Sequence, residues 1–242
     1  MNFLDQYYDQ NNQGKITVNG QQGSDFAKII ATDFNPIHDR DSKRFCVPGD
    51  LLFALALKEY GLHKNMVFEF LDLVSADTPL DYPEPISDDS ELKVLNNKEK
   101  AVLGVKFGGG GVKEAQKSEA LLKNYVAFSG QNFPHILVPL MKQHGVMINP
   151  ARPLVIYKSM SFEINDLSFS ELEITLEKTE LTVKGKRGDA NLFFSIKSNG
   201  QKIGSGIKTL VLSGLREYDE VAVQQLSDAY FHRKATWEQG AE

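Results

Sequence analysis

The distribution of proline constrains this chain more than any other feature. All nine prolines lie at or before Pro153, and none occurs from Leu154 onward. Proline lacks a backbone donor and is excluded from the middle of sheets, so a long segment without it is free to form paired strands. Within that segment Leu172, Ile174 and Leu176 alternate with polar residues, which predicts a strand with one buried face.

Turn signals divide the proline-free segment into a meander. Asn199-Gly200 is a strong hairpin signal because both residues tolerate positive φ. We expect it to join strands over residues 192–198 and 201–212. A turn is expected near Lys178, and another strand over residues 153–164.

The other expected elements follow from apolar spacing and from breaks in it. Apolar residues three and four positions apart predict a helix near the C-terminus, followed by frayed residues. The first half should begin with a short strand over residues 15–18 and a helix that holds Phe26, Ile29 and Ile30, followed by one strongly apolar helix and three further strands. The expected ranges are helices over 50–60 and 219–234, strands over 66–74, 91–95 and 101–107, and a frayed end over 235–242.

Composition excludes several classes of protein. The net charge is −5 at pH 7, so we expect no nucleic acid and no membrane partner, because phosphate binding needs clustered Lys and Arg. Cys46 is the single cysteine, which excludes an intrachain disulfide and a cysteine-rich metal site. We expect no metal and no cofactor. The longest apolar run, residues 51–57, is shorter than the roughly 18 residues of a membrane span, and no signal peptide is evident. A cytoplasmic protein is expected.

The chain contains a weak internal repeat. Residues 26–36 align with residues 125–134, which places Asp33 of the first copy opposite Gln131 of the second. Each copy begins within a helix and is expected to lead into an apolar helix and then strands, and this shared order favours an ancient duplication. Because an amide cannot act as a base, any retained activity is expected in the first copy.

The most specific motif extends from Phe26 to His38 and includes Asp33-Phe34-Asn35-Pro36-Ile37-His38. This segment resembles the MaoC-like family, which includes the (R)-specific enoyl-CoA hydratases. Their signature is a helix that ends in Ser-Gly-Asp-x-Asn-Pro-(Ile/Leu/Val)-His. The resemblance implies an α+β double hotdog, in which antiparallel sheets wrap a central helix in each half. Taken whole, the chain also resembles a proteobacterial family of domains of unknown function, and that likeness implies no activity.

We therefore expect two units. Residues 1–112 would form an N-terminal hotdog unit that carries the motif, and residues 113–242 a C-terminal hotdog unit with the decayed motif and the terminal helix. Gly108–Gly111 is interpreted as a linker or hairpin end, because it lacks the spacing of a phosphate-binding loop. A double hotdog contains its own pseudo-dimer, so a monomer or a homodimer is expected.

The resemblance also assigns roles to residues. In the similar hydratases an Asp and a His flank the water that adds to a trans-2-enoyl thioester, while an Asn holds the loop or the water. By position these residues are Asp33, His38 and Asn35. The developing enolate oxygen needs a donor as well. The backbone N–H of Gly49, at the start of the predicted central helix, would supply it, because the helix dipole favours negative charge there.

Three residues depart from the family pattern. Thr32 replaces the glycine before the Asp, and Pro48 occupies the position of a family His. Asp50 places a carboxylate beside the expected oxyanion position, where it would repel negative charge, unless it only caps the helix. These departures concern the chemistry of the site more than the fold.

Three hypotheses for function follow. The leading one is a hydratase or dehydratase, an enoyl-CoA hydratase-like lyase that acts on an acyl thioester through Asp33 and His38. The alternative is a non-catalytic hotdog module that binds an acyl group, another small ligand or a protein partner. The third is a hotdog thioesterase in which Asp33 or Asp50 activates water. We interpret Cys46 as a small buried residue and not as a nucleophile.

Overall fold

The proline-free half folds into four long antiparallel strands, as its alternation predicts. They are β8 (Val155–Ile164), β9 (Glu173–Lys184), β10 (Arg187–Ser198) and β11 (Gln201–Ser213) in a computed structural model that describes residues 1–240. Asn199 and Gly200 have φ values of 49° and 75°, and they join β10 to β11. The hairpin prediction is therefore confirmed.

The turn expected near Lys178 is wrong. Strand β9 continues through this position, and its pairing with β10 shifts register there: Lys178 lies opposite Phe193, whereas Leu176 lies opposite Phe194. One extra residue, Glu177, is accommodated as a β-bulge, which bends a strand without ending it. The break in alternation that suggests a turn in the sequence is thus a break in register.

The first half supplies a shorter set of strands. These are β1 (Asp9–Gln10), β2 (Ile16–Thr17), β3 (Leu62–Phe70), β4 (Leu80–Asp81), β5 (Ser90–Asn96) and β6 (Ala101–Val112). The strand expected over residues 66–74 is displaced toward the N-terminus and ends at Phe70. The linker interpretation of Gly108–Gly111 is wrong, because these glycines lie in β6. Gly108 pairs with Asn65, and Gly111 pairs with His63.

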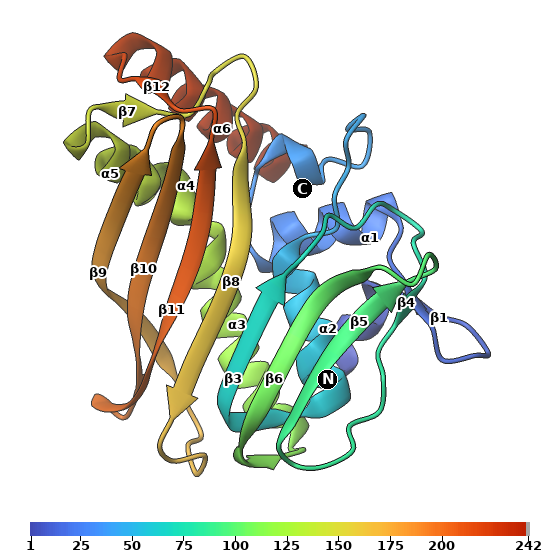
Figure 1. Ribbon diagram of the computed structural model, residues 1–242. Coiled ribbons are helices and arrows are strands. Elements are labelled where there is room, and N and C mark those ends of the chain that lie inside the picture. The colour runs from blue at the N-terminus through green and yellow to red at the C-terminus, as the bar shows by residue number, and fades with distance from the viewer. Residues whose placement is uncertain (241–242) are drawn as a thin grey trace.

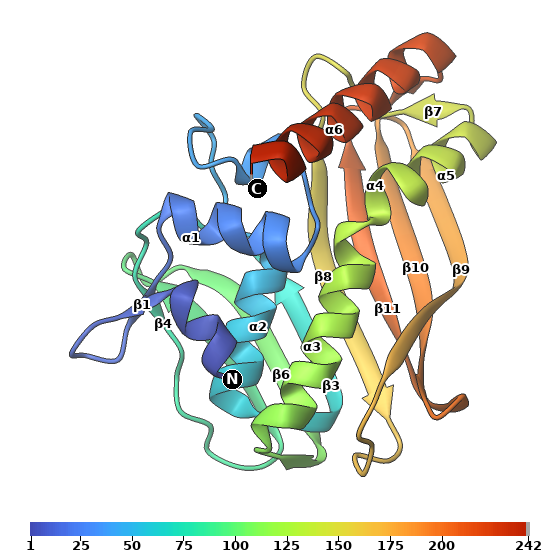
Figure 2. The same ribbon diagram turned by 180° about the vertical axis from the view of Figure 1, so that it is seen from behind.

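All ten of these strands form one sheet. Their order is β1-β2-β4-β5-β6-β3-β8-β11-β10-β9, and the recorded pairs are antiparallel. The two halves join where β3 pairs with β8, from Asn65 opposite Glu163 to Glu69 opposite Ser159. Figure 1 shows the sheet from the front, and Figure 2 shows the helices that lie against its other face. The chain is an α+β double hotdog.

Two helices fill the inner face of the sheet. Helix α2 (Gly49–Tyr60) buries nine of its twelve residues, including the whole run Leu51–Leu57, as a helix that is apolar on every side must. Helix α3 (Ala115–Gly130) buries Leu121, Leu122 and Tyr125. Phe53 of α2 packs edge-on against Tyr125, with 5.2 Å between ring centroids. The two helices therefore share one core.

The remaining elements lie around these two helices. Helix α6 crosses the top of the second half and extends to Gly240, so the frayed end expected over residues 235–242 is wrong for 235–240, while 241–242 lie outside the described residues. Within residues 1–240 no helix is long and apolar enough to cross a membrane. The bounds are η1 (Asn2–Gln6), α1 (Gly20–Asp25), η2 (Phe26–Ile30), η3 (Pro36–His38), α4 (Asn132–His135), α5 (Leu137–Gln143), β7 (Val146–Met147), β12 (Arg216–Glu217) and α6 (Glu220–Gly240).

The last residue of α3 touches the backbone just after η2. A Cβ atom on Gly130 would lie 1.7 Å from the carbonyl oxygen of Ala31. No side chain fits there, so glycine permits the close approach of two backbone segments. This contact brings together the helix ends with which the two copies of the repeat begin.

We expect the Gly130→Ala substitution to destabilise the protein strongly. The added methyl group would overlap a backbone carbonyl, and only a shift of α3 or of the loop after η2 could relieve it. The free energy of unfolding should fall by about 3 kcal/mol, at the upper end of overpacking effects. Chemical denaturation monitored by circular dichroism measures this change. Gly240→Ala is the matched control, because nothing lies within 4 Å of that Cβ position; equal stability of the two variants would contradict the prediction.

Candidate active site

The loop that follows η2 begins with an unusual backbone conformation. Thr32 has a φ of 52°, in the left-handed region that favours glycine. Two hydrogen bonds hold it: Asp33 N–H donates to Ala27 O at 2.8 Å, and the Tyr230 hydroxyl of α6 donates to Thr32 O at 3.1 Å. Thr32 therefore adopts a conformation that a glycine, the residue of the family pattern, adopts at less cost.

The side chains of Asp33 and Asn35 organise the next residues. Asn35 N–H donates to Asp33 Oδ1 at 2.9 Å, and Ile37 N–H donates to Asn35 Oδ1 at 3.2 Å. The second bond caps η3, whose first residue is Pro36. These bonds are side-chain turns of the kind Asp and Asn favour. Asn35 thus holds the loop, while Oδ2 of Asp33 remains available.

Asp33 and His38 face each other. His38 Nε2 lies 3.7 Å from Asp33 Oδ2, and Nδ1 lies 2.7 Å from the carbonyl oxygen of Cys46. A carbonyl only accepts, so Nδ1 carries the proton, and in the neutral ring Nε2 is an acceptor. Two acceptors therefore point toward the same place. A water at ordinary hydrogen-bond distance from both could donate one proton to each.

Gly49 is the first residue of α2, and aromatic rings cover it. A Cβ atom there would lie 2.9 Å from Tyr157 and 3.2 Å from Phe70. These two rings pack with 4.2 Å between their centroids. The first backbone N–H groups of a helix have no partner within the helix. The glycine lets the rings of β3 and β8 close over the start of α2.

Asp50 does not cap α2, which corrects one reading of its role. The N-cap residue is Pro48, and no side chain bonds there. Asp50 Oδ2 instead accepts a hydrogen bond from the Ser129 hydroxyl at 2.6 Å. Lys208 Nζ donates to the same hydroxyl oxygen at 2.5 Å and to Ser129 O at 3.3 Å. The three side chains form a buried chain from α2 through α3 to β11.

Burial governs the titration of this network. Asp50 is 8% exposed, Ser129 4% and Lys208 4%. Desolvation raises the pKa of the Asp50 carboxyl, against the opposing effects of Lys208 and Ser129. Desolvation also lowers the pKa of the Lys208 amine, and the carboxylates of Asp50 and Asp33 oppose this. In this site with little water, each charged partner offsets part of the desolvation cost of the other.

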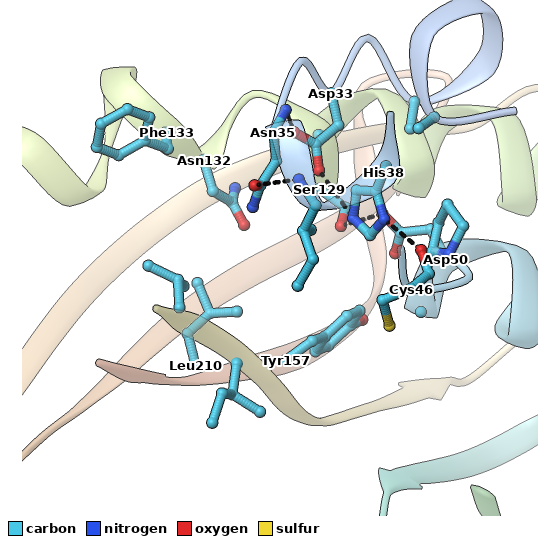
Figure 3. A pocket seen from close by; sticks show the side chains of 18 of the residues that line it. Asp33, Asn35, His38, Cys46, Asp50, Ser129, Asn132, Phe133, Tyr157 and Leu210 are labelled. Atoms are coloured by element: carbon cyan, nitrogen blue, oxygen red, sulfur yellow. Dashed lines mark hydrogen bonds and ion pairs between the residues drawn. The ribbon is translucent and has the colours of Figure 1, made fainter. Parts of the chain in front are cut away.

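These groups line one cavity of about 230 Å³. All four residues predicted as a site, Asp33, Asn35, His38 and Gly49, lie on its wall. Figure 3 shows Asp33, His38, Asp50 and Ser129 gathered on one side, with Tyr157 and Leu210 across from them. Much of the remaining wall is apolar and comes from both halves of the chain, including Leu52, Val74, Leu137, Ile148, Val155, Leu210 and Leu226.

Ser129, Lys208 and Tyr157 line the cavity but are not among the residues predicted from the sequence. A signal for Lys208 exists: it is in phase with the buried residues Leu210 and Leu212, so it occupies an inward position of a strand. A lysine at such a position needs a partner. Ser129 and Tyr157 have no comparable signal, because hydroxyl residues are common at half-buried positions.

Asn132 and Gln131 show what the second copy of the repeat contributes. Gln131, the counterpart of Asp33, is exposed and does not line the cavity, whereas Asn132 does. Asn132 Nδ2 donates to Phe128 O at 3.0 Å, and its buried Oδ1 has no partner among the described residues 1–240. No group of three His, Cys, Asp or Glu in this part of the chain is arranged to hold a metal ion.

Cys46 lines the cavity but should be chemically inert. Burial raises the pKa of its thiol to about 11, from a usual value near 9. The thiolate is the reactive form, so its fraction at pH 8 falls roughly 100-fold. We expect no alkylation of the folded protein by iodoacetamide at pH 8 over a period that fully alkylates the urea-unfolded chain, as intact mass measures. Equal rates in the two states would contradict the buried assignment.

The solved structures that resemble this chain share little sequence with it. The acyl-CoA thioesterase II TesB2 from Mycobacterium marinum matches with a TM-score of 0.46 and 7% identity, over 90% of this chain and 98% of that one. A putative thioesterase II from Thermobifida fusca YX gives 0.45 and 9%, over 86% and 95%. A MaoC-like dehydratase gives 0.40 and 9%, over 86% and 98%. Similarities this low carry no information about the reaction.

A search of curated proteins found no match. One family profile does match, and its description is "Protein of unknown function (DUF3581)". The match covers residues 2–221, which include both halves of the sheet and the polar residues of the site from Asp33 to Lys208, but not Leu226 and Tyr230 of α6. The chain therefore belongs to the DUF3581 family of proteins of unknown function.

Proposed function

We propose that this protein is a hydratase or dehydratase that acts on an enoyl thioester, in the manner of the MaoC-like branch of hotdog proteins. One observation carries the proposal: Asp33 Oδ2 and His38 Nε2 face each other at 3.7 Å on the wall of a largely apolar cavity. Two adjacent acceptors suit a group that donates two hydrogen bonds, and water is the smallest such group.

Hydration needs one group that accepts a proton from water and a route by which a proton reaches the α-carbon. In hydration, the water oxygen bonds to the β-carbon while Asp33 or His38 takes a proton from it. The same pair then returns a proton to the α-carbon, so that H and OH add across the double bond. Dehydration is the reverse. Positioned acid–base groups of this kind accelerate reactions by roughly 10² to 10⁴.

The surroundings suit a thioester. The helix dipole and free N–H groups at the start of α2 favour the negative charge that develops on the thioester oxygen. Gly49 lines the cavity at this position. An acyl chain would lie against the apolar residues that both halves supply, such as Leu137, Ile148 and Leu210. The substrate partner is accordingly an acyl thioester of the CoA type.

Thioester hydrolysis is the second candidate, and the geometry favours it less. It would need Asp33 or Asp50 to activate water for attack on the carbonyl carbon. Asp50 Oδ2 already accepts a hydrogen bond from the Ser129 hydroxyl, and burial raises the pKa of this carboxyl, which disfavours its charged form. Asp33 remains, but its placement beside His38 suits addition to a double bond equally well.

We expect the wild-type protein to consume crotonyl-CoA, observed as loss of enoyl absorbance, with 3-hydroxybutyryl-CoA as product. The Asp33→Asn variant should lose roughly 10² to 10⁴ of this rate, because the amide cannot accept the proton. It should keep its stability, because the amide oxygen can still accept the hydrogen bond from Asn35 N–H.

Asp41→Asn is the matched control, since Asp41 lies on the same loop with its side chain 88% exposed. Its rate should equal that of the wild type. If the wild type releases free thiol from the same substrate and Asp33→Asn abolishes this release, the activity is thioester hydrolysis and not hydration. Absence of turnover with thioesters of several chain lengths would contradict both activities and leave the non-catalytic binding module.

A further inference from the structure

Lys208 is a buried lysine on the wall of the cavity, and the proposed reaction does not yet use it. It lies on β11 in phase with the buried residues Leu210 and Leu212, and it is 4% exposed. Burying an ammonium group in an apolar core costs several kcal/mol unless partners compensate. An uncharged side chain of similar size would fill this space at a lower desolvation cost. A role in the cavity explains why a charge is placed there.

The hydrogen bonds of Lys208 leave one donor free. An ammonium group has three N–H bonds. Two acceptors belong to Ser129, its hydroxyl oxygen at 2.5 Å and its carbonyl oxygen at 3.3 Å. No third acceptor for Nζ is found among residues 1–240. Because Lys208 lines the cavity, a ligand there can receive the remaining N–H.

The ring of Tyr157 links Lys208 to the start of α2. Lys208 Nζ lies 4.4 Å from the centroid of this ring. The Cβ position of Gly49 lies 2.9 Å from the same ring. The Tyr157 hydroxyl is hydrogen bonded to that of Tyr125, which fixes the ring. Lys208 and the free N–H groups of α2 therefore border the same part of the cavity.

We propose that Lys208 Nζ donates a hydrogen bond to the thioester carbonyl oxygen of the bound ligand, next to the N-terminus of α2. This inference rests on the proposed function, because it assumes a thioester in the cavity. In this arrangement Lys208 of the second half contacts the thioester carbonyl, whereas Asp33 and His38 of the first half hold the water.

The position of Asp50 supports this assignment. A lone carboxylate beside a developing oxyanion would repel it. Ser129 connects Asp50 to Lys208 through bonds of 2.6 and 2.5 Å, so the carboxylate faces a cation and the pair has no net charge. The free N–H of Lys208 then directs positive charge toward the ligand. A preorganised cation in a dry site stabilises an oxyanion strongly.

The test measures polarisation of a bound carbonyl and needs no turnover. The probe is 4-(dimethylamino)cinnamoyl-CoA, a push–pull thioester whose absorbance moves to longer wavelength when a positive donor contacts its carbonyl oxygen. We expect saturable binding with a red shift for the wild type and for Asp33→Asn. The Lys208→Met variant should bind roughly tenfold or more weakly and lose the red shift at saturation, as expected for loss of a charged hydrogen bond.

Two further variants control for folding and for charge. Lys208→Met leaves Asp50 without its cation, so the double variant Asp50→Asn/Lys208→Met removes both charges and should also bind without the red shift. Lys202→Met is the matched control, because Lys202 is an exposed lysine of the same strand that pairs with Glu177. It should behave as the wild type.

The outcomes separate the two proposals. Binding with a full red shift in Lys208→Met, or in the double variant if the single one does not fold, overturns the role of Lys208 and leaves the thioester site intact. Absence of saturable binding to the wild type overturns the thioester site, and the role of Lys208 with it. A red shift that is lost in Lys208→Met, together with no hydration of crotonyl-CoA by the wild type, supports the role of Lys208 and counts against the hydratase.

Discussion

The pairing of β3 with β8 is the contact on which the rest of the structure depends. It joins two sheets into one, against which α2 and α3 pack side by side in a shared core. The start of α2, the end of α3 and the inward side of β11 then converge on one cavity. Neither half contains a complete site: the first supplies Asp33 and His38, and the second supplies Ser129 and Lys208.

The buried network of Asp50, Ser129 and Lys208 makes the core sensitive to substitution, but it also places a polar group in the cavity. Loss of one charged partner would leave the other buried and unpaired, which is among the costlier single changes in a core. In return the network holds a polar group with a spare donor inside an apolar cavity. Ser129 makes this possible because its hydroxyl donates to Asp50 while it accepts from Lys208. An alanine there would remove the link between the two charges.

The sequence predicts the fold and the loop well because both follow from local patterns. Alternation reveals β8 to β11, Asn199-Gly200 reveals their hairpin, and the motif locates Asp33, Asn35 and His38 on a single turn. The failures are nonlocal. The bulge opposite Phe193 resembles a turn until the partner strand is known, and Gly108–Gly111 resembles a linker until β3 pairs with it. Ser129 and Lys208 join the site through tertiary packing, so no spacing in the sequence connects them to Asp50.

The hydrogen bond from Tyr230 to Thr32 has a consequence for the nascent chain during synthesis. The loop that carries Asp33 takes its hydrogen bond from a hydroxyl 198 residues further along the chain. A ribosome that has synthesised the whole sheet has still not supplied that donor. A nascent chain that lacks α6 therefore lacks both this hydrogen bond and the part of the cavity wall that Leu226 and Tyr230 supply.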